Sequence, residues 1–206
     1  MKILPAALAW VAVATIALGV VPASGQQRRL RMPAASTVRY RPAETPMSTP
    51  DRAALISQLT GDALNATALA EPVRLSVKHP DQAGRIFMDA LYVSAYSGGI
   101  DGVEAWDLER GAPNLRLFIL AGVITKPALV DCLVQGRPLS STTYPMSVRF
   151  EQQGSSSQKI PITAEVGHAI TLVAPPVGNA RSMMTISRQN PDYELFIYYC
   201  EVTATQ

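Results

Sequence analysis

The sequence contains few of the side chains that enzymes and metal proteins use for chemistry. Two histidines, two cysteines and 6% aromatic residues occur among its 206 residues. The nucleophile elbow G-x-S-x-G, the zinc motif HExxH and the glycine-rich phosphate loop are all missing. His79 and His168 each stand at a predicted turn, and we interpret both as solvated turn residues because neither has partners at metal-ligand spacing. The sequence predicts no catalytic residue, no metal site and no cofactor.

Charged residues and long apolar runs are also scarce. Only 17% of the residues are charged and 48% are hydrophobic, which is too apolar a composition for a disordered chain. The 16 prolines and 13 glycines interrupt the chain too often for a helical bundle or a coiled coil. A chain of this length corresponds to one domain, with or without an appendage.

Residues 1–25 have the pattern of a secretory signal peptide. Lys2 precedes the uncharged apolar run Ile3–Val21, and small residues follow up to Gly25. Cleavage after Ala23 or after Gly25 satisfies the small-residue rule at the cleavage site. We therefore expect a secreted or periplasmic protein.

An uncleaved membrane anchor is the alternative interpretation of this segment. The apolar run is just long enough to span a bilayer, and Arg28, Arg29 and Arg31 directly after it disfavour translocation. Pro5 and the small residues that end the run favour cleavage. We expect contact with a membrane only if the segment stays uncleaved.

Residues 26–50 are predicted to form a basic, proline-rich arm or linker. All the arginines of this arm precede the first acidic residue, Glu44, whereas the rest of the chain carries 12 basic and 16 acidic residues. A solvated, flexible tail is one interpretation of the arm; the other is a segment that binds an anionic surface or polymer. Nucleic acid is not an expected partner of an exported protein. The arginines of the arm are Arg28, Arg29, Arg31, Arg39 and Arg41.

A short helical segment is predicted over residues 51–70. Thr49 is the expected N-cap, Pro50 and Asp51 suit the first turn, and Gly61 can end the helix. Residues Asp62–Ala70 either extend the helix or form a second turn.

From Val73 onward the hydrophobic period changes from 3.6 to 2, which is typical of half-buried β-strands. Arg85–Tyr96 and Leu115–Val123 are apolar on both faces and are expected at the centre of a sheet. Pro161 indicates an edge strand. No segment between the strands is long enough for a crossover helix, so residues 71–206 are predicted to form an antiparallel β-sandwich or barrel of about eight strands. The predicted strand segments are 73–78, 85–96, 115–123, 129–134, 146–151, 159–166, 169–174, 182–187 and 194–203.

Cys132 and Cys200 are predicted to form a structural disulfide. Two cysteines in an exported protein are more often bonded than free, and neither belongs to a CxxC motif. Period two places Cys132 on one face with Val130, and Cys200 on one face with Phe196 and Tyr198, so both sulfurs should point into the core. Closing so long a loop is worth roughly 4 kcal/mol on the chain-entropy model.

Residues Ser97–Ala112 are predicted to form a long, glycine-rich loop between two strands. Calcium binding or glycoside hydrolysis by its carboxylates is compatible with this composition, although the acids lack the spacing of an EF-hand loop. The alternative is an ordinary connection whose tryptophan packs back onto the sandwich. The candidate ligand-contact residues are Asp101, Glu104, Trp106 and Asp107.

These features favour an exported, non-enzymatic binding or structural module that acts at the cell envelope or outside the cell. Its expected partner is an envelope or extracellular protein, a glycan or another polymer, or an anionic surface. Two alternatives remain open at this point: a hydrolase that uses the carboxylates of the 97–112 loop, and an N-terminally anchored accessory subunit of an envelope complex. A β-sandwich by itself does not decide among them.

Overall fold

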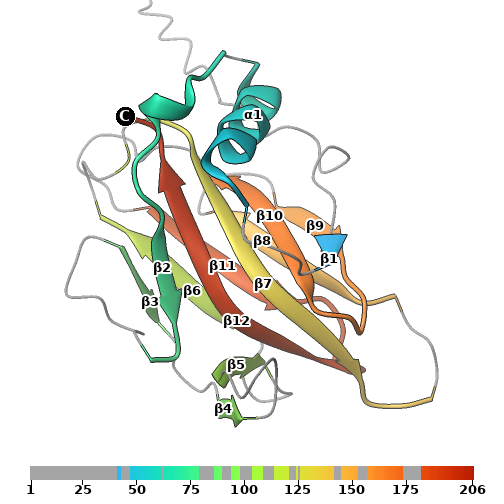
Figure 1. Cartoon of the computed structure of the whole chain (residues 1–206). Helices are drawn as coiled ribbons and strands as arrows, with labels where there is room; N and C mark the ends of the chain where they lie inside the picture. Colours follow the sequence, from blue (N-terminus) through green and yellow to red (C-terminus); the bar gives the residue numbers. More distant parts are fainter. Residues whose placement is uncertain are drawn as a thin grey trace, which may run out of the picture.

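A computed structural model describes residues 41–42, 47–61, 63–78, 86–89, 94–97, 104–108, 114–120, 124, 126–141, 145–152, 157–173 and 182–206. These residues form two antiparallel sheets that pack face to face, with one helix over one end of the larger sheet (Figure 1). The predicted antiparallel β-sandwich is confirmed. The predicted signal segment lies outside the described residues.

The larger sheet has seven strands and the smaller sheet has five. The larger sheet contains β1 (Arg41–Pro42), β2 (Val73–Ser76), β4 (Ser94–Ser97), β5 (Glu104–Leu108), β7 (Ala128–Pro138), β10 (Gly167–Val173) and β12 (Tyr193–Ala204). The smaller sheet contains β3 (Ile86–Asp89), β6 (Asn114–Ile119), β8 (Ser147–Gln152), β9 (Gln158–Pro161) and β11 (Ser182–Arg188). The strand orders are β1-β10-β7-β12-β5-β4, with β2 also paired to β12, and β3-β6-β11-β8-β9. Pro161 lies in β9 at the edge of the smaller sheet, as predicted.

The predicted central strand Arg85–Tyr96 is wrong. Its described residues belong to two short strands, β3 and β4, which lie at the edges of different sheets. The apolar character of the segment is continuous across both strands, so hydrophobic periodicity could not show that the chain changes sheets. The Leu115–Val123 prediction is confirmed in part, because β6 lies inside the smaller sheet between β3 and β11.

The helix α1 spans Thr49–Thr60, and its N-cap is not the residue that the sequence predicted. Ser48, rather than the predicted Thr49, is the N-cap, and its hydroxyl accepts a hydrogen bond from the backbone N–H of Asp51 at 3.3 Å. Gly61 ends the helix with φ of 75°, a left-handed conformation that suits glycine. A 3₁₀-helix, η2 (Ala66–Ala68), follows, so the helix does not extend through residue 70.

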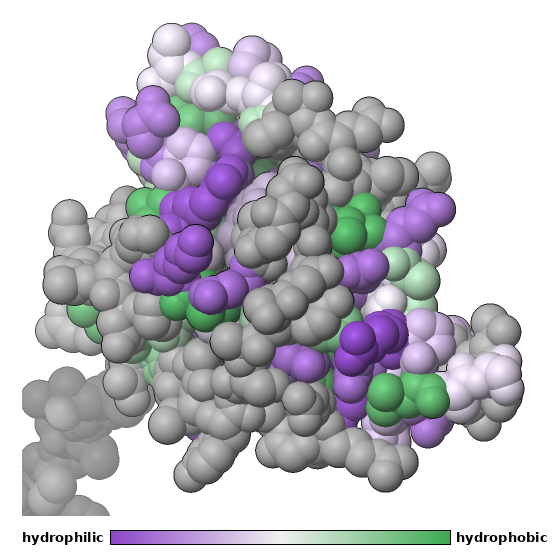
Figure 2. Space-filling model, turned by 60° about the horizontal axis from the view of Figure 1, so that its bottom comes forward, coloured by the Kyte–Doolittle hydropathy of each residue, from purple (hydrophilic) through white to green (hydrophobic). Residues whose placement is uncertain are grey.

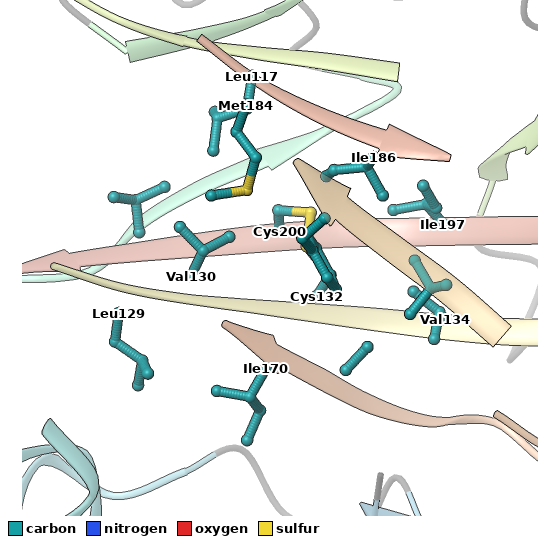
Figure 3. Packing of buried hydrophobic residues seen from close by; sticks show 14 of the residues in the cluster. Leu117, Leu129, Val130, Cys132, Val134, Ile170, Met184, Ile186, Ile197 and Cys200 are labelled. Atoms are coloured by element: carbon teal, nitrogen blue, oxygen red, sulfur yellow. A yellow bond between two sulfur atoms is a disulfide. The ribbon is translucent and has the colours of Figure 1, made fainter. Parts of the chain in front are cut away.

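The core lies between the sheets and continues under α1. Cys132 and Cys200 are bonded to each other, are fully buried and belong to this core, which confirms the predicted disulfide (Figure 3). Trp106 on β5 is also buried in the core. On the helix, Ala53, Ile56 and Leu59 are buried, and they join the same core cluster as Leu129 and Ile170 of the larger sheet. The helix therefore covers part of the sheet face that points away from the sandwich interior.

A register shift in β12 changes which residues face the core. The pairing with β7 slips between Ile197 and Tyr199. Cys200 faces the main core as predicted, but Phe196 and Tyr198 belong to a second buried cluster with Leu133. A β-bulge adds one residue to one strand, so the strict alternation that predicted a shared face fails across it.

The described surface carries no extensive hydrophobic patch. Leu139 is the one large hydrophobic residue in the described ranges that is exposed, at 48%. In Figure 2, hydrophobic side chains occur in small, separate groups among hydrophilic ones. None of the helices formed by the described residues has the length and apolarity needed to cross a membrane.

Candidate functional site

The sheet face opposite the disulfide, called the outer face below, carries a group of charged and aromatic side chains. Asp131 directly precedes Cys132 in β7, so its side chain points to the other side of the sheet. Its register partner Glu201 in β12 lies on the same side, and Arg74 of β2 is the next partner in that row. His168 and Tyr199 form the neighbouring row. Four strands thus bring residues that are far apart in sequence onto one face.

Glu201 is the centre of this group. Its side chain is buried, with an exposed fraction of 8%, and it forms ion pairs with Arg52 of α1 and Arg74 of β2. Nε and Nη2 of Arg74 both donate to Oε1 of Glu201, at 2.9 and 2.6 Å. Arg52 is buried as well, whereas half of the Arg74 side chain is exposed. One carboxylate therefore ties α1 and β2 to the central strand β12, because paired charges tolerate burial that an isolated charge would not.

Arg74 also lies over an aromatic ring. Its guanidinium carbon is 4.2 Å from the ring centroid of Tyr199, which is half-buried. A second pair of this kind occurs further along β12, where Arg137 lies 5.0 Å over the ring of Phe196 and donates from Nε to Glu194 at 2.6 Å. Each guanidinium is held by a carboxylate and a ring together. The outer face thus presents two arginines in fixed orientations, each with about half its side chain exposed.

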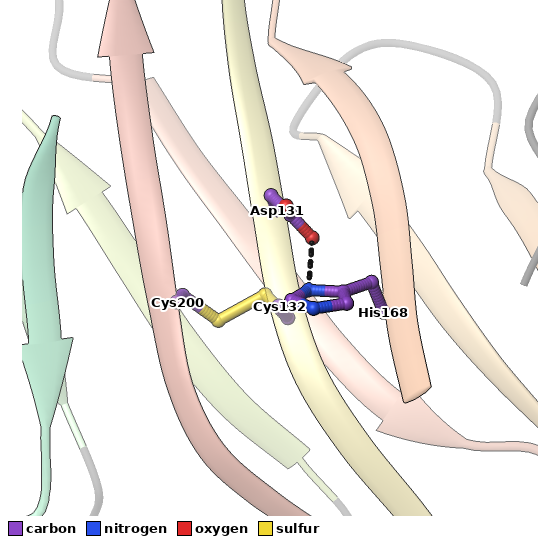
Figure 4. Close-up of a disulfide and its surroundings, with 4 residues drawn as sticks. All are labelled: Asp131, Cys132, His168 and Cys200. Atoms are coloured by element: carbon purple, nitrogen blue, oxygen red, sulfur yellow. Dashed lines mark hydrogen bonds and ion pairs between the residues drawn. A yellow bond between two sulfur atoms is a disulfide. The ribbon is translucent and has the colours of Figure 1, made fainter. Parts of the chain in front are cut away.

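The interpretation of His168 as a solvated turn residue is wrong. His168 is 2% exposed, lies within β10 and has Nδ1 at 3.0 Å from Oδ1 of the buried Asp131 (Figure 4). A carboxylate can only accept, so Nδ1 carries the proton. The glycine before His168 suggested a turn, but Gly167 instead begins the strand. His79, the other histidine interpreted as a turn residue, lies outside the described residues.

An aspartate that orients a histidine is also part of many hydrolytic sites. The described residues contain no hydroxyl or thiol that is hydrogen-bonded to His168. The pair connects β10 to β7 across the outer face, because Asp131 is paired in register with Ile170 and His168 with Leu133. The contact between His168 and Asp131 is thus a buried link between two neighbouring strands.

The predicted ligand loop is in part a strand. Glu104–Leu108 form β5, which pairs with β4 and β12, so the assignment of all of Ser97–Ala112 to a loop is wrong. Trp106 is buried in the core, and Asp107 is buried on the face opposite to it. Glu104 is half-buried at the start of the strand, and Asp101 lies outside the described residues. Trp106 and Asp107 therefore point to opposite faces of the sheet and do not share one contact surface. Metal-binding groups of three or more acidic, cysteine or histidine side chains are absent from the part of the chain that the structure describes.

The arginine arm is described only at its end. Arg28, Arg29, Arg31 and Arg39 lie outside the described residues. Arg41 begins β1, which pairs with the edge of β10, so this part of the predicted arm is a strand of the larger sheet.

Sequence reasoning missed the residues that make up the outer face. Arg52 and Glu201 stand at positions that the periodicity marks as solvent-facing, and their burial depends on α1 lying against the sheet. The one available signal was Asp131 within the otherwise apolar run 128–134. An acid in such a run must find a partner if it is buried.

No family model matches the sequence, and no curated protein matches it. Among solved structures, the chain is similar to the mosquito-larvicidal Cry4Aa toxin from Bacillus thuringiensis, with 9% identity and a TM-score of 0.43 over 66% of this chain and 24% of the toxin chain. It is also similar to a family 35 carbohydrate-binding module from Clostridium thermocellum, with 11% identity and a TM-score of 0.40 over 65% of this chain and 98% of the module. A third similar structure is the CBM22-1 xylan-binding domain from Paenibacillus barcinonensis, with 9% identity and a TM-score of 0.43 over 66% of this chain and 96% of that domain. At these identities and TM-scores the similarities do not indicate a ligand for this chain.

Proposed function

We propose that this chain is an exported, non-enzymatic binding module that recognises a glycan on the outer face of its seven-stranded sheet. The observation that carries this proposal is the arrangement of Arg74, Tyr199 and Glu201. The guanidinium of Arg74 lies over the Tyr199 ring. Any other orientation of the guanidinium would break its two hydrogen bonds to Glu201.

This arrangement suits a ligand that has both hydroxyl groups and apolar ring faces. A guanidinium has five N–H donors in one plane, which suits hydroxyl oxygens. The two donors that point to Glu201 set the orientation of this plane, and half of the Arg74 side chain is exposed. The half-buried Tyr199 ring adds apolar surface and a phenolic group next to them. Because the neighbouring residues already order these side chains, little side-chain conformational entropy is lost when a ligand binds.

The charges on the outer face favour an uncharged glycan over a highly anionic polymer. Arg74 and Arg137 each pair with a glutamate, and Asp131 is buried beside His168. These carboxylates offset the positive charge of the arginines, so the described part of the face has no excess of cations to attract a polyanion.

Export is supported by the pattern of residues 1–25 and by the disulfide. A bond between Cys132 and Cys200 persists in the oxidising compartments that exported proteins reach. A periplasmic or extracellular location places the module where envelope and environmental polysaccharides occur.

The test is binding of the purified protein to a glycan panel and to immobilised envelope polysaccharides, followed by calorimetry on any ligand found. Arg74→Ala and Tyr199→Ala should each weaken binding by about tenfold or more, which corresponds to about 1.4 kcal/mol. Lys159→Ala is the matched control, since it removes an exposed cation from β9 of the other sheet. Equal loss in all three variants, or unchanged affinity in the two outer-face variants, contradicts the proposal.

Co-sedimentation with envelope fractions distinguishes this function from recognition by the arginine arm. Retention that high salt abolishes, and that deletion of residues 26–39 also abolishes while β1 is kept, would assign binding to the arm and an anionic surface. Retention that resists salt and depends on Tyr199 supports the outer face.

A further inference from the structure

On the outer face, the side chains of β12 follow the same order from either end of the strand. Glu194 and Phe196 lie toward one end, and Tyr199 and Glu201 lie toward the other. From each end, a carboxylate is followed by an aromatic ring two residues nearer the middle. The strand therefore carries two copies of one pattern, running in opposite directions.

The bulge in β12 places both copies on the same face. Glu194 and Glu201 are separated by an odd number of residues, so strict alternation would put them on opposite faces. The register shift between Ile197 and Tyr199 adds one residue and restores the outward direction beyond it. On β7, the register partners of the two glutamates are six residues apart, an even number. The bulge thus aligns the two copies on the outer face.

Each glutamate holds an arginine from a different neighbouring strand. Arg137 of β7 pairs with Glu194. On the opposite side of β12, Arg74 of β2 pairs with Glu201 (Figure 1). In both pairs, Nε and Nη2 of the arginine contact a single carboxylate oxygen. Both glutamate side chains are largely buried, whereas about half of each arginine side chain is exposed. The two arginines are therefore held in the same way.

Both guanidinium groups lie toward the middle of β12. The guanidinium of Arg74 lies over the ring of Tyr199, two residues nearer the middle than Glu201. The guanidinium of Arg137 lies over the ring of Phe196 in the corresponding position. On β7, the register partners of the two rings are two residues apart, or about 7 Å. Those of the two glutamates are six residues apart, so both copies fit within about 20 Å.

We propose that the outer face binds a linear, neutral glycan that contacts Arg74 and Arg137 at once, with the glycan chain running over the middle of β12. This inference rests on the proposed glycan-binding function and names the ligand class, which is a chain of repeated sugar units and not a single terminal sugar. Two copies of one arginine–ring–carboxylate arrangement suit a ligand that presents the same groups more than once. Each exposed arginine is paired with a glutamate, which favours a neutral chain over a polyanion.

Contact with both arginines makes the affinity depend on the length of the glycan. A sugar bound at one copy brings the rest of its chain to the other, so the second contact forms at a high effective concentration. An oligosaccharide too short to reach both arginines lacks this gain. We therefore expect the affinity to rise by about tenfold or more once the oligosaccharide spans both copies, and to change little for longer chains.

Calorimetry with oligosaccharides of graded length tests the proposal. The probes are cello-, malto- and manno-oligosaccharides of two to eight sugar units, together with the same range cut from any polysaccharide that the glycan panel retains. Arg137→Ala should abolish the gain with length, so that long and short oligosaccharides bind this variant equally. Arg149→Ala on β8 is the matched control and should keep the gain, because it removes an arginine–glutamate pair from the smaller sheet.

Thermal unfolding monitored by circular dichroism shows whether each variant is folded. Arg137→Gln removes the guanidinium but keeps more of the side chain, and it replaces Arg137→Ala if the alanine variant unfolds. The same loss of the gain is expected for both substitutions.

The outcomes separate this inference from the proposed function. Affinity that does not depend on length in the parent protein, or an equal gain in the parent and in Arg137→Ala, overturns the two-arginine site while Arg74 continues to carry binding. Loss of the gain in Arg149→Ala as well would overturn it too. A parent protein that binds no oligosaccharide or polysaccharide of any length overturns the proposed function, and this inference with it.

Discussion

Cys132 and Cys200 lie directly opposite each other on β7 and β12, with their Cα atoms 4.1 Å apart. The disulfide therefore joins two strands that are already neighbours in one sheet, and not the two sheets to each other. It fastens the last strand of the fold to β7 without setting the distance between the layers.

We predict that the double variant Cys132→Ala/Cys200→Ala folds to the same structure with lower stability. Removing the cross-link should lower the free energy of unfolding by about 4 kcal/mol or somewhat less, because the cross-link restricts the unfolded chain over 68 residues of separation. Urea denaturation monitored by circular dichroism measures the change. An unfolded double variant in the absence of urea would show that the bond is required for folding itself.

Among the charged residues of the outer face, Glu201 should cause the largest loss of stability when it is substituted. Glu201→Ala leaves the buried Arg52 without its carboxylate and should cost about 3–5 kcal/mol of unfolding free energy. The double variant Arg52→Met/Glu201→Leu should be more stable than Glu201→Ala, because it removes both buried charges. Glu151→Ala on β8 is the control, since its pair with Arg149 is exposed and should contribute about 1 kcal/mol at most.

His168 is expected to contribute to stability through Asp131. His168→Ala leaves a buried carboxylate oxygen without the donor at 3.0 Å and should cost about 1–3 kcal/mol. Because Asp131 and His168 lie on the outer face beside Leu133 and Ile170, the double variant Asp131→Leu/His168→Leu should recover part of that loss. Chemical denaturation of Asp131→Leu, His168→Leu and the double variant gives the coupling energy between the two residues. Additive losses of unfolding free energy would contradict a direct link between them.

The N-cap of α1 can be assigned by two neighbouring alanine substitutions. Ser48→Ala removes the hydroxyl that accepts from the N–H of Asp51 and should cost about 1 kcal/mol. Thr49→Ala replaces the first helical residue and should change stability by much less. The opposite order in thermal unfolding would support Thr49, the cap that the sequence suggested.

Local patterns predicted much of the β-fold because strands such as β9 and β11 alternate between a buried face and a more exposed one. Met146–Glu151, for example, predicted β8 to within one residue. Strand assignment failed where one apolar run served two sheets, as in Arg85–Tyr96. The strand 194–203 was predicted, but the assignment of Phe196 and Tyr198 to the face of Cys200 failed at the bulge in β12. Both failures have a tertiary cause, because a change of sheet and a register slip have no period of their own in the sequence.

The outer face was harder to predict than the core. Hydrophobic positions identify themselves through their periodicity, but a charged residue such as Glu201 looks the same in the sequence whether it is solvated or buried against α1. His168 shows the same difficulty, since the glycine before it is typical of turns and also begins a strand here. Partner residues from four strands and a helix must be in place before the group exists.

The position of β12 has a consequence for how the molecule is made. β12 is the last strand in the sequence, and yet it lies inside the larger sheet. It pairs with β7 on one side and with β2 and β5 on the other. Synthesis from the N-terminus therefore delivers β2, β5 and β7 before the strand that joins them exists. Pairing over such sequence distances is slow, and the sheet cannot close until residue 204 has left the ribosome. The topology thus delays closure of the larger sheet until β12 has been synthesised.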